Sequence, residues 1–277
     1  MATMLGLTPQ QKAALVVVSG LPAPPGVGGV IVQGYDRDAA RPSGALVFVD
    51  QEGGKVKTFP RLPPRSSARA VRSKAEAFES GAATGRALGR TGVDVDLAPV
   101  LDLTDGPLGS RQFRSPPFGV AFARGLAAGG AGSCVKHFPG LGSLRFSTDE
   151  HPYVVGQVRD ADLAPYRAAV EAGVQCVMVG HGVYPTLGRR RAALEPGAYR
   201  LLRDLGFEGV AITDSLDVVR GHAQDWAVAA ARAGADLLLF TSGRDATRAI
   251  RVLLPLARSG ELDAHVARVL RFRLVID

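Results

Sequence analysis

Polar and charged residues follow five of the short apolar, β-branched runs along this chain. The set comprises Asp50, Gln51 and Glu52, then Asp102, then Lys136 and His137, then His181, and finally Asp214. A carboxylate at such a position can attack the anomeric carbon of a sugar. Lysine, arginine, aspartate and histidine side chains supply the donors and acceptors that sugar hydroxyls need. Carbohydrate chemistry is therefore the first hypothesis for this set.

Eight apolar runs are the elements that must position these residues. They span residues 15–20, 28–34, 45–51, 93–100, 133–140, 174–181, 209–216 and 235–243. Helical patterns separate the later runs, and helices such as 73–92 and 162–173 end in Gly just before the next run, as at a C-cap. Apolar strands alternating with helices indicate a parallel sheet covered on its faces. The sequence therefore predicts an α/β fold: a (β/α)8 TIM barrel, a single domain over residues 1–277.

In such a barrel the C-terminal strand ends and the loops after them form the active site, so the polar set should converge on one mouth. His181 is as readily a structural residue as a functional one. Residues 21–27 are expected to be a Pro/Gly loop rather than a helix. The final helical stretch, 261–276, has no strand after it, and we expect it to pack outside the barrel.

The composition excludes several classes of protein. Hydrophobic residues make up 46% and charged residues 21%, which indicates a globular domain rather than a disordered or collagen-like chain. The net charge is +7, but the arginines are scattered apart from Arg189, Arg190 and Arg191, and aromatic residues are only 6%. A nucleic-acid binder usually gathers its cations on one face. A dinucleotide fingerprint, a P-loop and a GxSxG elbow are also missing. We therefore expect no nucleic-acid partner, no cofactor and no metal.

The cysteines and the N-terminus bear on the compartment. Cys134 and Cys176 lie in apolar runs, where we expect buried free thiols without metal spacing or a disulfide framework. The N-terminus lacks a basic segment followed by a long apolar stretch, so it resembles neither a signal peptide nor a membrane span. We expect a cytoplasmic protein with no membrane partner, favour a monomer, and place His222 and His265 at the surface.

Five ordered motifs resemble those of a known family. CVKHFPGLG (134–142) is similar to KHFPGHG, and FVDQEGGKV (48–56) to VDQEGGRV. DLAPVLDL (96–103), followed by GSRQF (109–113), resembles FAPVLDL and GERSF. The stretches 162–181 and 206–216, the latter ending in ITDSL, also match in order and spacing. The chain is thereby identified as a member of glycoside hydrolase family 3, in its single-domain β-N-acetylhexosaminidase (NagZ-like) branch.

The resemblance implies a role for individual residues. Asp214 of ITDSL matches the nucleophile of the family. Asp50, Arg111, Lys136 and His137 match positions that bind the hydroxyl groups of the sugar. The branch takes its general acid/base from a loop histidine paired with an aspartate two residues earlier, which implies His151 with Asp149. It also implies a retaining exo-β-glycosidase with a small carbohydrate substrate, releasing N-acetylglucosamine from muropeptides in peptidoglycan recycling or from related glycosides.

Three departures from the family pattern bear on the site. Leu141 stands where KHFPGHG has its second histidine, and the loop before Asp149 is about two residues longer. Thr58, with Lys57 beside it, stands where the branch has a substrate-contacting arginine, and a lysine does not reproduce a bidentate guanidinium fork.

Two alternatives therefore stay open. One is a family 3 glycosidase or phosphorylase with a different sugar specificity. The other is a catalytically dead sugar-binding homologue. The run Arg189–Arg191 follows a strand, and we expect it near the rim, where it would attract an anionic aglycone.

Overall fold

The computed structural model describes residues 6–151, 153–218 and 223–276. These residues form an eight-stranded sheet in the order β7-β6-β5-β4-β3-β2-β1-β8, and neighbouring strands are parallel. A parallel bridge between Ile212 and Leu237 joins β7 to the start of β8 and closes the barrel. The strands are β1 (Val17–Ser19), β2 (Gly29–Val32), β3 (Leu46–Val49), β4 (Val95–Asp96), β5 (Gly132–Phe138), β6 (Cys176–Val179), β7 (Val210–Thr213) and β8 (Leu238–Phe240).

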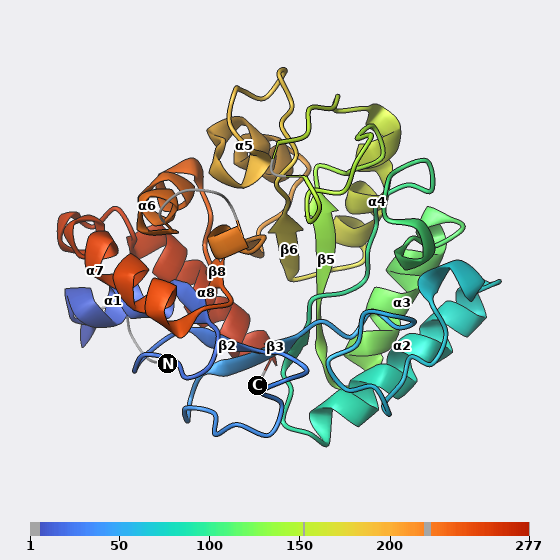
Figure 1. The fold of residues 1–277 in the computed structure, drawn as a ribbon, viewed down its shortest axis with the longest axis horizontal. Helices are drawn as coiled ribbons and strands as arrows, with labels where there is room; N and C mark the ends of the chain where they lie inside the picture. Colours follow the sequence, from blue (N-terminus) through green and yellow to red (C-terminus); the bar gives the residue numbers. More distant parts are fainter. Residues whose placement is uncertain (1–5, 152, 219–222, 277) are drawn as a thin grey trace.

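Helices surround this barrel (Figure 1), with α2, α3 and α4 on one side of it and α1, α6 and α7 on the other. None of the described helices is long and apolar enough to cross a membrane. The helices are α1 (Pro9–Leu15), α2 (Lys74–Gly89), α3 (Pro116–Ala128), α4 (Asp160–Glu171), α5 (Pro196–Asp204), α6 (Ala223–Ala233), α7 (Gly243–Ser259) and α8 (Asp263–Ile276).

The predicted (β/α)8 barrel is confirmed, and each of the eight predicted runs overlaps one strand. Local signals explain the helix boundaries. The Ser73 side chain accepts the Glu76 N–H and so caps α2, while Gly173, just after α4, has a φ of +80° that favours glycine. Residues 21–27 contain no helix, as expected.

The final helix differs from the expectation. Val269 and Phe272 of α8 are buried in the same cluster as Val95 and Cys134, whose side chains belong to the inner face of the barrel. Ile276 also packs against this cluster and lies beside Gly132, the first residue of β5. The helix α8 therefore closes the N-terminal end of the barrel instead of lying outside it.

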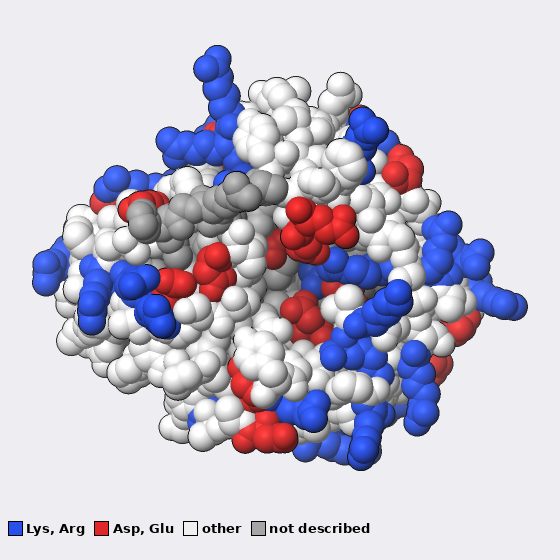
Figure 2. Space-filling model, in the orientation of Figure 1, with Lys and Arg blue, Asp and Glu red and all other residues white. Residues whose placement is uncertain are grey.

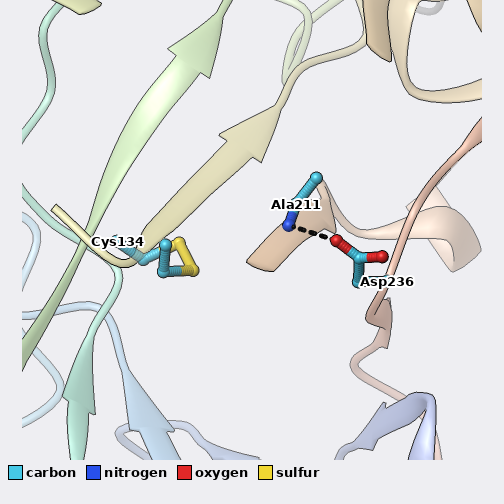
Figure 3. Close-up of a disulfide and its surroundings, with 4 residues drawn as sticks. Cys134, Ala211 and Asp236 are labelled. Atoms are coloured by element: carbon cyan, nitrogen blue, oxygen red, sulfur yellow. Dashed lines mark hydrogen bonds between the residues drawn. A yellow bond between two sulfur atoms is a disulfide. The ribbon is translucent and has the colours of Figure 1, made fainter. Parts of the chain in front are cut away.

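The two cysteines are bonded to each other, so the expectation of free thiols is wrong. Cys134 of β5 and Cys176 of β6 are register partners with Cα atoms 4.4 Å apart, and they form a disulfide inside the barrel (Figure 3). Sequence spacing missed this pair because the residues are 42 positions apart and meet only when β5 and β6 pair. Disulfides are rare in cytosolic proteins, so this bond weighs against the expected cytoplasmic location.

A second buried group, Asp236, links α5 and α8 to the sheet. Its side chain is fully buried and accepts the backbone N–H of Ala211 at 2.9 Å (Figure 3). The same carboxylate accepts Nη2 of Arg203 and Nε of Arg268, both at 2.7 Å, and contacts Nδ1 of His265 at 2.9 Å. His265 is therefore not the surface residue we expected, and His222 lies outside the described residues.

Burial raises the pKa of Asp236, but its hydrogen bond with His265 and the charges of Arg268 and Arg203 outweigh burial and hold the pKa below its ordinary value. Since the folded-state pKa is depressed, the stabilisation is present above the unfolded pKa and is lost as the pH falls through the folded value.

Replacing Asp236 removes the anion that Arg203, Arg268 and the His265 ring share. We expect Asp236→Ala to lower the free energy of unfolding by about 3–5 kcal/mol at pH 7, the cost of breaking a buried pair. Urea unfolding measures this, and the deficit should shrink as the pH falls below about 4. Asp38→Ala, at a side chain that is 95% exposed, is the matched control and should unfold like the wild type. A wild-type urea midpoint for Asp236→Ala would contradict the assignment.

Asp96, on β4, is also a buried carboxyl, but its pKa is raised where that of Asp236 is lowered. Its Oδ1 accepts the backbone N–H of Gln51 at 2.9 Å, but Oδ2 is buried with no partner among the described residues. Burial is the main reason that the pKa of Asp96 rises to about 8; Asp50 and Glu52 add to the rise, while the Gln51 N–H and Lys136 oppose it. At neutral pH this carboxyl is therefore largely protonated.

An Asp96→Asn variant should separate this ionisation from other pH effects. The raised folded-state pKa means that wild-type stability falls as the pH rises from the unfolded value towards 8. Asparagine keeps the acceptor for Gln51 but does not ionise. We therefore expect the stability of the variant relative to the wild type to grow by at most about 1.4 kcal/mol per pH unit between pH 5 and 8. Urea unfolding across this range is the measurement; a constant difference would mean that Asp96 is already ionised at pH 5.

Candidate active site

A pocket of about 250 Å³ lies at the C-terminal ends of the strands. Among the residues that line it are Asp50, Arg111, Lys136, His137, Asp149 and Asp214. Figure 2 shows a hollow near the middle of the face in view, with acidic and basic side chains at its edge. A larger cavity of about 440 Å³ lies between α3 and the end of α8, but no carboxylate or histidine lines it. Chemistry of the predicted kind therefore belongs to the smaller pocket.

Glu52 is the centre of the charged network in this pocket. Its side chain is 3% exposed and receives Arg111 Nε and Nη2, both at 2.8 Å, and Lys136 Nζ at 2.7 Å. Burial raises the pKa of Glu52. The charges and hydrogen bonds of Lys136 and Arg111 outweigh burial and bring the pKa down to about 2. Lys136 also binds Asp50 Oδ1 at 2.6 Å. Burial lowers the pKa of Lys136, but Asp50 and Glu52 outweigh burial and raise it, so the ammonium stays charged.

Glu52 was not among the predicted binding residues, although a signal for it was present. Residues two apart along an extended segment point to the same side. Asp50 and Glu52 have this spacing, and both pair with Lys136.

His137 is held by Asp102. Nδ1 of the ring lies 2.8 Å from Asp102 Oδ2, and the other carboxylate oxygen accepts the Leu141 N–H at 2.7 Å. A carboxylate accepts from Nδ1–H, which leaves Nε2 free to contact a ligand. The Lys136–His137 peptide bond is cis, the register of β5 with β6 shifts here, and both side chains line the pocket.

Asp214 is half-buried and follows β7. Its Oδ1 accepts the Ser215 N–H at 2.8 Å. Burial raises the pKa of Asp214, but the histidines at 181 and 137, the Ser215 N–H and Lys136 together outweigh burial and lower the pKa. The carboxylate is therefore ionised at neutral pH, as a nucleophile must be.

His181 fixes the backbone beside Asp214. The ring is 4% exposed, and Nε2 lies 2.9 Å from the Ser215 carbonyl oxygen, so it acts as the donor there. Nδ1 is buried without a partner among the described residues. Farther along, Asp217 accepts the Ser215 and Thr241 hydroxyls and the Ser242 N–H. These contacts tie the segment after β7 to the segment after β8.

The loop between β5 and α4, residues 139–159, holds Asp149 and His151 in different places. Asp149 lines the pocket and accepts Arg111 Nη1 at 3.1 Å. His151 is exposed, and its ring centroid lies 4.3 Å from that of Phe146. The two predicted partners therefore sit on the same loop, but the expected Asp149–His151 contact is replaced by an Arg111–Asp149 ion pair in this structure.

The departures at Leu141 and Thr58 are both explained by packing. Leu141 is 1% exposed and belongs to an apolar cluster beneath the loop with Val100, Leu108, Leu144 and Val154. Thr58 is 4% exposed, and its hydroxyl donates to the Val32 and Asp50 carbonyl oxygens, both at 3.2 Å. Neither side chain lines the pocket. Among the described residues, no cluster of three or more His, Cys, Asp or Glu could hold a metal ion.

Comparisons with known proteins show the family of this chain. The glycosyl hydrolase family 3 N-terminal domain matches residues 31–272. A beta-hexosaminidase of Stenotrophomonas maltophilia is 33% identical over 207 residues, which cover 66% of this chain and 62% of that protein. The beta-hexosaminidase LpqI of Mycobacterium tuberculosis is 32% identical over 293 aligned positions, covering 88% of this chain and 74% of that protein.

Solved structures agree in fold over nearly the whole chain. The structure of Mycobacterium tuberculosis LpqI superposes with a TM-score of 0.86 at 27% identity, covering 96% of this chain and 94% of that one. A family 3 glycosyl hydrolase of Mycobacterium smegmatis gives a TM-score of 0.85 at 28% identity, covering 98% of both chains. The Stenotrophomonas match spans less than two thirds of that relative. Because the family domain covers most of the barrel and its mouth, this chain belongs to glycosyl hydrolase family 3.

Proposed function

We propose that the protein is a retaining exo-β-glycosidase, a β-N-acetylglucosaminidase that acts through a glycosyl-Asp214 intermediate. The observation that carries the proposal is an ionised carboxylate at the end of β7 in a pocket that also presents Asp50, Arg111, Lys136 and His137. Relatives named beta-hexosaminidase support the choice of sugar. A volume of about 250 Å³ lies below the ~300–1,000 Å³ of sites for drug-sized ligands, which suits one terminal sugar residue.

Sugar binding divides between fixed and free groups. Asp50 is 31% exposed and, with Arg111 and His137 Nε2, has hydrogen-bonding capacity left for hydroxyls. The buried Lys136 holds Asp50, the buried Glu52 holds Arg111, and Asp102 holds His137. We place wall-derived muropeptides or related β-N-acetylglucosaminides as substrates, with residues 1–277 as one catalytic domain acting as a monomer.

The acid/base role of His151 requires the 139–159 loop to move. The Arg111–Asp149 pair ties its tip to the pocket, and the Phe146–His151 ring contact lies within the loop itself. Asp149 is 59% exposed, and an exposed pair contributes only about 0–1 kcal/mol. Breaking it to bring His151 over the glycosidic oxygen therefore costs little. Once released from Arg111, Asp149 would accept the Nδ1 proton and fix the tautomer of His151.

The nucleophile can be tested directly. Asp214→Ala should lower kcat/KM for an aryl β-N-acetylglucosaminide by about 10⁴-fold or more while the circular dichroism spectrum stays unchanged, because the side chain is outside the core. An activated 5-fluoro glycoside should label Asp214 in the wild type, as read by peptide mass spectrometry, and Asp214→Asn should take no label. Label on another residue would overturn the assignment.

The role of His151 is tested with two substrates that differ in their leaving groups. A good leaving group departs without a proton, so His151→Ala should lower kcat/KM for an alkyl glycoside about 10²–10⁴-fold more than for an activated aryl glycoside. Asp149→Asn should show the same pattern more weakly. Thr148→Ala, on the same loop, is the control and should affect both substrates alike. Equal loss on both substrates in His151→Ala would indicate a binding role, and no loss on either would mean that another group is the acid/base.

A further inference from the structure

The segment that follows β3 carries only positive charge. Between residues 53 and 72 the sequence contains no aspartate or glutamate. Its charged residues are Lys55, Lys57, Arg61, Arg65, Arg69 and Arg72. We call residues 53–72 the cationic segment.

The first part of the cationic segment is fixed to the wall of the pocket. The buried Gln51 side chain accepts the Phe59 N–H at 2.9 Å and donates to the Phe59 and Pro63 carbonyl oxygens at 3.1 and 2.9 Å. The Thr58 N–H donates to the Asp50 carbonyl oxygen at 2.9 Å. Val56 lines the pocket between Lys55 and Lys57. These cations therefore lie beside the mouth on a backbone that the substrate-facing strand end holds in place.

Among the described residues no carboxylate pairs with the side chain of one of these cations, although Glu76 accepts the Arg72 backbone N–H at 2.8 Å. Arg111, Arg159 and Arg203 each form an ion pair with a carboxylate, whereas no cation of the cationic segment does so among the described residues. Lys57 Nζ donates to the Pro60 carbonyl oxygen at 2.7 Å. Partial burial and the nearby charge of Arg65 lower the pKa of Lys57. Figure 2 shows basic side chains beside the hollow, over the region where Figure 1 draws the segment between β3 and α2. An anion bound here would relieve this repulsion.

We propose that Lys57 and Arg65 form an anion subsite at the mouth of the pocket, which binds a carboxylate on the aglycone. The inference rests on the proposed function, because it places one sugar in the pocket and the group bonded to that sugar at the mouth. Two cations with no carboxylate partner among the described residues, on a segment that Gln51 ties to the wall of the pocket, suit an oxyanion.

The cationic segment is a stronger candidate than the Arg189–Arg191 run. The Glu195 carboxylate accepts the Arg190 N–H at 3.2 Å and so places a negative charge beside that run. Val56 of the cationic segment lines the pocket, whereas no residue of 189–191 does.

Two matched glycosides test the subsite. The probes are 4-carboxyphenyl and 4-carbamoylphenyl N-acetyl-β-D-glucosaminide, which differ in charge but little in shape. We expect the wild type to prefer the anionic probe, as judged by the ratio of kcat/KM values at low ionic strength. The Lys57→Gln, Arg65→Gln double variant should lower that ratio about 3- to 10-fold, since two screened charge contacts are lost. Added salt should lower the wild-type ratio towards that of the variant.

Controls keep the outcomes distinct. Arg86→Gln with Arg90→Gln removes two exposed charges at the C-terminal end of α2 and should leave the ratio unchanged. An unchanged ratio in Lys57→Gln, Arg65→Gln, with both probes still hydrolysed, would overturn the subsite alone. A fall produced instead by Arg189→Gln with Arg190→Gln would also overturn it. Failure of the wild type to hydrolyse either probe would refute the proposed function.

The same two cations would also bind inorganic phosphate, which would then accept the glycosyl group in place of water. A separate experiment distinguishes this alternative. The neutral probe is incubated with phosphate, and N-acetylglucosamine 1-phosphate is sought by mass spectrometry. Its absence supports an aglycone subsite. Its formation in the wild type and loss in Lys57→Gln, Arg65→Gln would assign the cations to the acceptor and overturn the aglycone reading.

Discussion

The buried carboxylate of Glu52 fixes the geometry on which the mouth of the barrel depends. A charge removed from water must be paired, and removing one partner of a buried pair costs about 3–5 kcal/mol. Arg111 meets this demand from the 3₁₀ turn Gly109–Arg111, and Lys136 meets it from β5. Three segments that are distant in sequence are therefore held together by one anion. Their side chains are positioned before any ligand arrives, which is how a site avoids reorganising its charges during a reaction.

The same arrangement decides which groups are left for a ligand. Lys136 is 3% exposed and shared between two carboxylates, so most of its role is to hold Asp50 and Glu52. Asp50 is the more exposed partner, and His137 has Nδ1 occupied by Asp102 but Nε2 free. Burial raises the pKa of Asp214, but His181, His137, Lys136 and a backbone N–H outweigh burial and keep the pKa below its ordinary value. Hydrogen-bond acceptors and an anionic carboxylate thus converge on one small cavity.

The sequence predicted the barrel well because short apolar runs and helices that end in glycine are local signals. Of the strand-end residues that it predicted to converge, Asp50, Lys136, His137 and Asp214 line one pocket, since parallel strands bring their C-terminal ends together, whereas Asp102 and His181 do not line it. It did not predict features that depend on pairing between distant elements. The Cys134–Cys176 bond needs the register of β5 with β6, and the His265–Asp236 contact needs α8 to fold under the barrel. The sequence also did not predict the conformation of the 139–159 loop, because a D-x-H spacing fixes neither where Asp149 points nor what His151 contacts.

The two sides of the mouth differ in how firmly they are held, and this difference suits the two parts of a glycosidase reaction. On the β3 side, several hydrogen bonds from Gln51 and Thr58 fix the backbone that carries Asp50 and Glu52. On the β5–α4 side, Leu141 and Leu144 anchor the base of the loop in an apolar cluster, while a half-exposed ion pair holds Asp149 at its tip. Recognition of hydroxyl groups gains from a rigid wall, because misplacement weakens every contact. Proton transfer needs a group that approaches the leaving oxygen only when the sugar is in place, and a weakly held tip on an anchored base allows that approach.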